Sequence, residues 1–359
     1  MTTTPCTLVT GGAGFIGCNL AARLAGEGRR VRIADNLSRA GVERNLAWLT
    51  GEFGEAIEFV ECDLRDRDAV CRVVAGATQV FHFAAQVAVT SSLEDPFTDF
   101  DINLGGTLNL LEAARRQPEV PGVIFASTNK VYGGLDDVVL EAANGRYQPV
   151  DSDLRARGIG EDRPLDFHSP YGCSKGGADQ YVHDYARCMG VPSVVFRMSC
   201  IYGPHQFGTE DQGWVAHFLI RALQGRPITL YGDGMQVRDI LHVNDVVAAY
   251  LAAERHLDRL SGQVFNLGGG PANTISLLQL LGWIEDLTGH YPEVRMADWR
   301  PGDQRYYVSD TGRFTEATGW RAHIAARDGV GDLFAWLQSS SGTAPGHPAA
   351  AGMACLSGA

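Results

Sequence analysis

The fold is decided by the stretch Val9-Thr10-Gly11-Gly12-Ala13-Gly14-Phe15-Ile16-Gly17. A short apolar run precedes these residues and a helical pattern follows them, so they predict a strand, a glycine turn and a helix. Glycines at these positions let the backbone turn tightly and approach a pyrophosphate, which the free N–H groups at the helix N-terminus would bind. A glycine-rich turn in another kind of α/β protein is the competing interpretation.

Asp35 favours the dinucleotide interpretation. It ends the next apolar run, Val31–Ala34. This is about 20 residues after the glycines, where a carboxylate would bond the ribose hydroxyls of an adenosine. A carboxylate there repels the 2′-phosphate of NADP, so the sequence favours NAD. Arg39, close by, weakens that preference because arginine would accept a 2′-phosphate.

Apolar runs alternate with helical patterns through the first half of the chain. This alternation predicts an α/β fold: a Rossmann-type doubly wound parallel sheet with helices on both faces and the cofactor at the carboxyl ends of the strands. The predicted strands are 7–10, 31–34, 58–61, 80–83, 122–126 and 193–198, and the predicted helices are 14–25, 43–50, 67–74, 97–116, 170–189 and 214–224.

Beyond about residue 200 the pattern is less regular. We expect residues 1–200 to form the NAD-binding domain, with parts of 225–270 interleaved, and residues 200–335 to form a smaller substrate-binding lobe. The polar stretch 134–164 predicts a long loop without a regular element, placed over the active site. Residues 339–359 are rich in Ser, Gly, Ala and Pro and predict a disordered tail.

Composition narrows the classes of function. The chain has 359 residues, of which 45% are hydrophobic and 20% charged, as in soluble globular proteins. A net charge of −12 argues against nucleic acid as a partner, although a local arginine cluster would still bind an anionic substrate. The eight cysteines lack metal-ligand spacing, so we expect no metal and a cytoplasmic protein with reduced thiols. No apolar run reaches the ~18 residues of a membrane helix.

A second motif, Tyr171-Gly-Cys-Ser-Lys175, carries acid–base chemistry. Ser169-Pro170 predicts a helix start, which places Tyr171 and Lys175 one turn apart on one face. A phenol has a reference pKa near 10, but a neighbouring ammonium and an oxidised nicotinamide would both favour the phenolate. Tyr171 would then take a proton from a sugar hydroxyl. An ordinary amphipathic helix surface is the alternative.

A third motif follows the strand that ends near Ala126. Thr128, in Ser127-Thr128-Asn129-Lys130, places a hydroxyl at a carboxyl end, where it would donate to the reacting oxygen. Turn chemistry at a strand end, which Ser and Thr favour, is the alternative interpretation.

Together these motifs resemble the extended short-chain dehydrogenase/reductase family, the nucleotide-sugar epimerases and dehydratases, over about residues 6–335. Asp63-Leu64, His82-Phe83-Ala84-Ala85, Asn103 and the run from Arg238 to Asp245 extend the resemblance. It implies an enzyme that uses NAD, with Thr128, Tyr171 and Lys175 as catalytic residues. The implied cofactor-binding residues are Gly11, Gly14, Phe15, Ile16, Gly17, Asp35, Asn36, Ser38, Arg39, Asp63, Leu64, Phe83, Ala84, Ala85, Gln86, Asn103, Ser127, Tyr171 and Lys175.

The resemblance also implies a nucleotide-diphosphate sugar as substrate. Arg238 and Arg300 would hold its diphosphate, and Asp303 would bond its ribose. Many family members have Asn at the position of Cys200, which also contacts the diphosphate; a thiol is a weaker donor. The implied substrate-binding residues are Val89, Thr128, Asn129, His168, Cys200, Gln206, Asp211, Gln212, Trp214, Arg238, Arg300 and Asp303.

Longer blocks point to one subgroup. Asp35–Arg39, Asn45–Trp48, Ser127–Gly133, Leu165–Lys175 and Asp211–Trp214 resemble the CDP-tyvelose (CDP-paratose) 2-epimerases, so a CDP-sugar is favoured. Dehydratases of the family have Asp-Glu directly after the Thr, whereas this chain has Asn129 and Lys130, which argues against elimination.

Several alternatives stay open at this point. The dyad alone does not separate C2 from C4 chemistry. The chain could be a 4-epimerase, a 4,6-dehydratase or a decarboxylase acting on a UDP-, GDP- or dTDP-sugar, or a non-catalytic NAD-sensing protein. By resemblance we also expect a homodimer formed through the helices 97–116 and 170–189.

Overall fold

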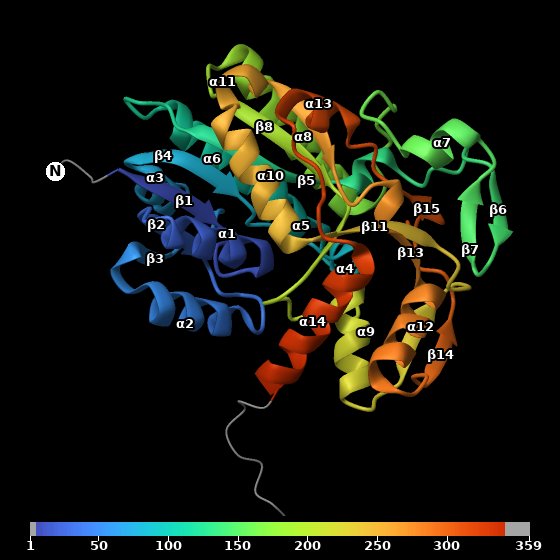
Figure 1. The fold of residues 1–359 in the computed structure, drawn as a ribbon. Coiled ribbons are helices and arrows are strands. Elements are labelled where there is room, and N and C mark those ends of the chain that lie inside the picture. The colour runs from blue at the N-terminus through green and yellow to red at the C-terminus, as the bar shows by residue number, and fades with distance from the viewer. Residues whose placement is uncertain (1–4, 342–359) are drawn as a thin grey trace, which may run out of the picture.

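The structure is a computed structural model in which residues 5–341 are described (Figure 1). Its centre is a seven-stranded, entirely parallel sheet in the order β3-β2-β1-β4-β5-β8-β12. The strand order reverses between β1 and β4, and a crevice is expected at their carboxyl ends. The strands are β1 (Cys6–Thr10), β2 (Val31–Asp35), β3 (Ile57–Glu61), β4 (Ala77–His82), β5 (Gly122–Thr128), β8 (Ser193–Met198) and β12 (Gln263–Leu267).

Alternate residues of each central strand enter two separate apolar cores. Val9 and Phe81 pack under α1, α2 and α10, whereas their neighbours Leu8 and Val80 pack under α3, α6 and α8. This two-sided burial explains why the strands read as continuous apolar runs. The covering helices are α1 (Phe15–Gly26), α2 (Val42–Phe53) and α10 (Val243–Arg255) on one face, and α3 (Arg67–Val74), α6 (Gly106–Arg115) and α8 (Ser169–Cys188) on the other.

The predicted α/β class and parallel sheet are therefore confirmed, and the six predicted strands all exist within three residues of their expected ends. The strand β12 was not predicted. It pairs with β8 and brings a segment of the second half of the chain into the first sheet.

A second lobe is built around its own apolar core, in which α9, α12 and α14 pack on short strands (Figure 1). The capping box at Ser276, with reciprocal bonds to Gln279, starts α12. The elements of this lobe are β9 (Cys200–Tyr202), α9 (Trp214–Leu223), β10 (Ile228–Tyr231), β11 (Val237–His242), β13 (Thr274–Ser276), α12 (Leu277–Thr288), β14 (Val294–Ala297), β15 (Tyr306–Tyr307) and α14 (Ala326–Ser341). Two further short helices, α11 (Leu257–Leu260) and α13 (Gly312–Thr318), pack instead on the core of the seven-stranded sheet.

The predicted helix 97–116 is confirmed in its extent, because the backbone is helical from Pro96 to Arg115. A π-helical turn (Asp101–Gly105), which was not predicted, lies within it between α5 (Pro96–Phe100) and α6, and α4 (Val89–Glu94) precedes it. Within this turn, the side-chain amide of Asn103 donates to Asp99 Oδ1 at 3.1 Å and to Ser174 Oγ at 3.0 Å. Such turns often mark functional sites.

The prediction for 134–164 is wrong on both counts. The stretch contains the hairpin β6 (Leu140–Ala143) and β7 (Arg146–Pro149) and the helix α7 (Ser152–Arg157). It packs on the second lobe, where Arg146 donates to Thr274 Oγ1 at 2.6 Å, and it contributes no residue to the large cavity described below. Polarity indicated exposure correctly, but the packing partners are distant in sequence.

Helix α14 extends to Ser341, which is three residues into the predicted disordered tail. The rest of that prediction, 342–359, lies outside the described residues. No helix between residues 5 and 341 has the length and apolar character required to cross a membrane.

Candidate active site

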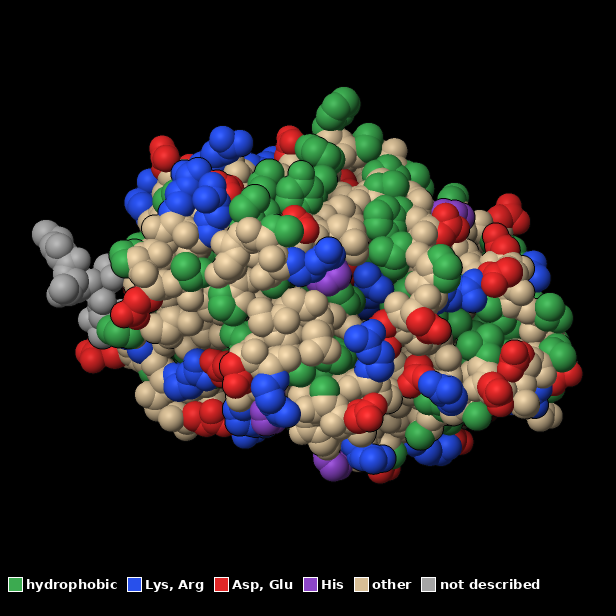
Figure 2. Space-filling view, turned by 90° about the horizontal axis from the view of Figure 1, so that it is seen from above, with side chains coloured by type: hydrophobic (Ala, Val, Ile, Leu, Met, Phe, Trp, Pro, Cys, Tyr) green, Lys and Arg blue, Asp and Glu red, His purple; other side chains and the backbone are tan. Residues whose placement is uncertain are grey.

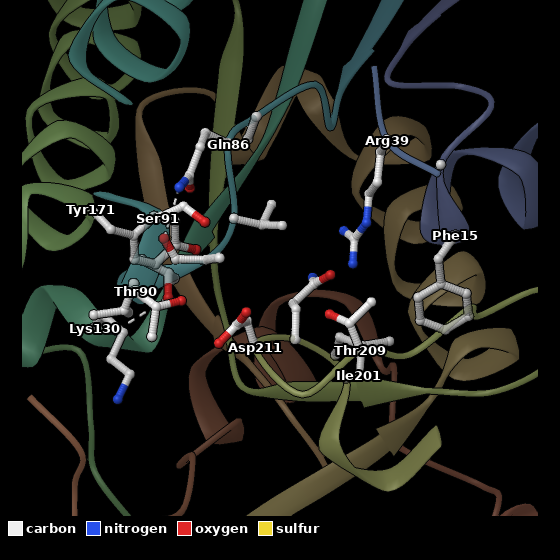
Figure 3. Close-up of a pocket in the computed structure, with 18 of the residues that line it drawn as sticks. Phe15, Arg39, Gln86, Thr90, Ser91, Lys130, Tyr171, Ile201, Thr209 and Asp211 are labelled. Carbon is white, nitrogen blue, oxygen red and sulfur yellow. Dashed lines mark hydrogen bonds between the residues drawn. The ribbon is translucent and has the colours of Figure 1, made fainter. Parts of the chain in front are cut away.

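One cavity of about 890 Å³ lies between the carboxyl ends of the sheet and the second lobe. Its volume is at the upper end of the range for ligand sites, which leaves room for more than one small molecule. Figure 3 shows Phe15 and Arg39 on one side of this cavity and Ser91 and Lys130 on the other. We call these sides the cofactor side and the substrate side.

The glycine turn of the cofactor side requires glycine for steric reasons. Gly11 has φ +66°, and a Cβ there would lie 2.6 Å from the backbone N of Ala84. A Cβ on Gly17 would collide with the carbonyl oxygen of Gly11. The turn therefore brings bare backbone to the start of α1, which is the arrangement that admits a pyrophosphate.

Asp35 joins the end of β2 to this turn. Its carboxylate accepts hydrogen bonds from Ala13 N at 3.1 Å and Leu37 N at 2.9 Å. Burial raises the pKa of the carboxyl above its ordinary value, and the backbone N–H groups partly offset that rise. The carboxylate lines the cavity, so its remaining acceptor capacity faces the ligand space.

Tyr171, Lys175 and Thr128 meet at the boundary of the two sides. Helix α8 starts at Ser169, which has a left-handed φ of +64° and whose Oγ accepts from Gly172 N at 3.2 Å. The N–H of Tyr171 donates to Ser92 Oγ at 3.2 Å, which fixes the start of α8 against α4. Lys175 lies 4.2 Å above the ring of Phe125 and is almost fully buried.

Burial dominates the ionisation of the two α8 residues. It raises the pKa of Tyr171 to about 12, against a smaller lowering by a hydrogen bond with Thr128. It lowers the pKa of Lys175 to about 7, against the attraction of Asp179 and Asp99. The pKa of Lys175 therefore lies close to neutral pH, whereas the free enzyme holds Tyr171 as the neutral phenol.

The backbone places the hydroxyl proton of Thr128. Lys130 N donates to Thr128 Oγ1 at 3.2 Å. Because this bond occupies an acceptor site of the oxygen, the hydroxyl hydrogen is available for Asn129 Oδ1 or for a group in the cavity.

Asn103, expected to bind the cofactor, does not line the cavity. It is buried and accepts Gln86 N at 2.9 Å, while its amide donates to Asp99 and to Ser174 between Tyr171 and Lys175. Asn103 therefore links the loop at Gln86 to the helix turn between Tyr171 and Lys175, and contacts cavity residues without lining the cavity itself.

A cationic cluster forms the floor of the substrate side. Arg238 Nη2 lies 2.7 Å from Asp303 Oδ1, and Lys130 Nζ lies 4.0 Å from the same oxygen. Lys130 Nζ also donates to the carbonyl oxygen of Gly302 at 3.0 Å. Asn129 Nδ2 donates to Gln304 at 3.1 Å, so neither position after Thr128 offers a carboxylate.

Arg300 forms the opposite wall. Its guanidinium lies 3.8 Å from the ring centroid of Tyr231 and donates to Glu210 O at 3.0 Å, with Asp211 at 3.6 Å. Tyr231 OH in turn donates to Glu210 Oε1 at 2.8 Å. Near this wall, Trp214 Nε1 donates to Cys200 Sγ at 3.4 Å, so the sulfur of Cys200 serves as a hydrogen-bond acceptor.

Most residues predicted for the site line this one cavity, the exceptions being Asn103 and His168. His168 precedes α8 and its Nε2 lies 3.1 Å from Asp166 Oδ2, outside the cavity. The family resemblance implied that His168 binds the substrate, but its side chain is half exposed and lies outside the cavity. The buried His82 lies between Thr10 and Thr107, as a core histidine would.

Sequence reasoning missed part of the substrate side. These residues lie on α4, α9 and β10, in the turn after Thr128 and in loops; Lys130 belongs to a quoted motif but was not expected to bind the substrate, and no motif identified the others. They are Thr90, Ser91, Lys130, Glu210, His217, Thr229, Tyr231 and Gln236.

Comparison with known proteins gives concordant results. Residues 7–268 match the NAD dependent epimerase/dehydratase family. The chain is 43% identical over 341 residues, covering 92% of this chain and 99% of the relative, to CDP-paratose 2-epimerase from Salmonella typhi. It is similar in structure to Thermus thermophilus UDP-glucose 4-epimerase in complex with NAD (TM-score 0.76, 33% identity) and to the Thermotoga maritima enzyme with UDP-glucose (TM-score 0.79, 30% identity), each covering 93% of this chain and 99% of the other.

Proposed function

The chain belongs to the NAD dependent epimerase/dehydratase family, and within it we propose that the protein is a nucleotide-sugar 2-epimerase acting on a CDP-sugar. The observation that carries this proposal is that Tyr171, Lys175 and Thr128 share one cavity with the glycine turn and the Arg238 cluster. Asn129 and Lys130 place an amide and an ammonium where elimination would need carboxylates. The 43% identity to a CDP-paratose 2-epimerase supports the choice of C2 and of CDP.

The cofactor side fits NAD. NAD, when bound, supplies reversible acceptance of hydride from a carbinol carbon. Gly11, Gly14 and Gly17 would hold its pyrophosphate, and Asp35 would bond the adenosine ribose. Asn36, Ser38, Arg39, Asp63 and Leu64 would also contact the adenosine of NAD. The loop Phe83–Gln86 would contact the nicotinamide half of NAD.

Tyr171 would act as the base. In the free enzyme its pKa is near 12, so it needs a positive field to ionise near neutral pH. The Lys175 ammonium and a cationic nicotinamide ring would supply that field. Thr128 would donate to the sugar oxygen as Tyr171 takes the proton, and Tyr171 would return the proton when the carbon is reduced on its other face.

The substrate side would bind the nucleotide and diphosphate. Arg238 and Arg300 offer fork-shaped donors for phosphate oxygens, and Asp303 would bond the ribose. In the structure these groups engage each other or protein carbonyls, so substrate binding would exchange those partners for phosphate. Val89, Gln206, Asp211, Gln212 and Trp214 would surround the sugar and base.

The test is incubation with CDP-, UDP-, GDP- and dTDP-hexoses, with the sugar configuration determined by NMR. A 2-epimerase gives a product of unchanged mass with inversion at C2, and deuterium placed at C2 stays there because hydrogen returns to the same carbon. Loss of water or carbon dioxide would contradict the proposal, as would inversion at C4. The Tyr171→Phe variant serves as the control for catalysis.

A second copy of the chain would be the protein partner, and the proposed reaction implies a cytoplasmic enzyme because NAD and nucleotide sugars are cytoplasmic metabolites. Helices α4 and α5 pack against α8. They expose Leu93, Phe97 and Phe100, at 48%, 82% and 52%, and α8 exposes Tyr181, at 42%. Figure 2 shows hydrophobic side chains most densely along the upper middle of that view, with others scattered over the rest of the face. Light scattering after size exclusion tests the homodimer; a monomer at micromolar concentration would contradict it, and Phe97→Asp should dissociate it.

A further inference from the structure

The distribution of lysine in this chain is unusual. Of its thirty lysine and arginine residues only two are lysine, Lys130 and Lys175, and both line the cavity. Every other basic position carries arginine. A compact ammonium is therefore used only where the ligand space begins, and Lys175 already has a role beside Tyr171.

Arginine and lysine differ in ways that matter at such a position. A guanidinium is planar, longer and always charged, whereas an ammonium is a point charge on a flexible stem. Lys130 projects from the short 3₁₀ turn Asn129–Tyr132 directly after Thr128, and its own N–H donates to the Thr128 hydroxyl. The ammonium is thus held within one side-chain length of the residue expected to touch the reacting oxygen.

The charged groups around Lys130 define an anion site. The ammonium faces Asp303 at 4.0 Å and the carbonyl of Gly302, while Arg238 and Cys200 line the cavity beside it. Asp303 is already paired with Arg238 at 2.7 Å, so two cations share one carboxylate. Figure 3 shows the Lys130 side chain extending away from Tyr171, toward the far end of the substrate side.

We infer that Lys130 is a specificity-determining residue: it binds the phosphoryl group attached to C1 of the sugar and thereby holds C2, rather than C4, at Tyr171. This inference rests on the proposed function. C1 carries the diphosphate and is the direct neighbour of C2, whereas C4 lies across the ring. The Lys130 stem starts two residues after Thr128 and its ammonium points away from Tyr171. It therefore favours the sugar orientation in which the diphosphate extends toward that ammonium while C1, and with it C2, lies nearest to Thr128 and Tyr171.

Binding measurements separate this role from a structural one. We expect Lys130→Met to weaken the binding of CDP by about tenfold to hundredfold, the range for a hydrogen bond to a charged group. Binding of cytidine, which has the same base and no phosphate, should change by less than about twofold. Arg295→Met is the matched control, because Arg295 is exposed, pairs with Glu293 and lies outside the cavity. An equal loss for cytidine, or no loss for CDP, would overturn the inference.

The pH dependence of CDP binding provides a second readout. Burial and Arg238 lower the pKa of Lys130 to about 8, with Asp303 opposing them. Wild-type affinity for CDP should therefore fall as the pH rises above about 8, because the free enzyme loses the ammonium. In Lys130→Arg the affinity should stay level through that range; the same decline in both proteins would overturn the assignment.

Turnover then tests the choice of carbon. Lys130→Arg should keep CDP affinity within about threefold of wild type, yet lose at least about tenfold in kcat, because the longer guanidinium displaces the diphosphate and with it C2. Full activity in Lys130→Arg would overturn the inference while leaving the proposed function intact. A wild-type enzyme that inverts C4 would overturn both.

Discussion

The two sides of the cavity are built in different ways. The cofactor side consists of backbone at the ends of adjacent parallel strands, with Gly11 against Ala84 and Asp35 bonded to Ala13 N. The substrate side is assembled from side chains of distant segments, as when Arg300 stacks on Tyr231 and both hold Glu210. The first side depends on close backbone contact, and the second on exchangeable polar contacts, so the same kind of substitution should have different consequences in each.

The largest effect should come from the boundary between the sides. Tyr171→Phe removes the proton acceptor and should reduce turnover by about a thousandfold, while NAD and CDP binding stay close to wild type. Steady-state kinetics and calorimetric titration measure the two quantities. Substantial residual epimerisation would show that another group carries the proton.

Steric change should be severe on the cofactor side. Gly17→Ala places a methyl group against the carbonyl of Gly11, and should abolish NAD binding and cost about 1–3 kcal/mol of the free energy of unfolding. Gly51→Ala is the control: Gly51 lies in α2, nothing lies within 4 Å of the added Cβ, and the change should stabilise by about 0.5–1 kcal/mol. Retained NAD affinity in Gly17→Ala would mean that the turn is less closely packed than described.

The buried cation should reveal itself in the pH dependence of stability. The Lys175 pKa is about 7 in the fold and about 10.4 when unfolded, so between these values the unfolded chain binds the extra proton and stability rises with pH. Below pH 7 Lys175 is protonated in both states, so the full cost of burying its ammonium lowers the free energy of unfolding. In NAD-free protein, Lys175→Met should therefore be inactive yet more stable than wild type near pH 7, by about 1 kcal/mol or more, and the difference should shrink toward pH 10. Denaturant titrations at several pH values check this sign.

The smallest effect is expected on the substrate side. Arg300→Met should raise KM for the nucleotide sugar by about tenfold, with NAD binding and thermal stability unchanged, because its contacts are polar and partly solvated. Arg295→Met, an exposed arginine of the same lobe, should change neither. If Arg300→Met lost NAD binding, the two sides would not be independent.

The fold and the cofactor side were largely predictable because local chemistry determines them. The glycine spacing, the position of Asp35 after its strand and the spacing of Tyr171 and Lys175 each act within one turn or one strand end. The substrate side was only partly predictable, since Glu210, Tyr231 and Gln236 become neighbours only through packing. His168 shows the converse: the resemblance implied a substrate-binding residue, yet its side chain pairs with Asp166 outside the cavity.

By itself the sequence determined the parallel sheet, the glycine turn and the Tyr–Lys pair, because periodic burial and backbone sterics act over short distances along the chain. Only the tertiary structure decided that 134–164 packs on the second lobe, that Asn103, within a π-helical turn, joins Gln86 to Ser174, and that Lys130 meets Asp303 and Gly302. Those outcomes depend on polar groups finding partners more than seventy residues away, or on the shape of a shared core, and neither is encoded in a local pattern.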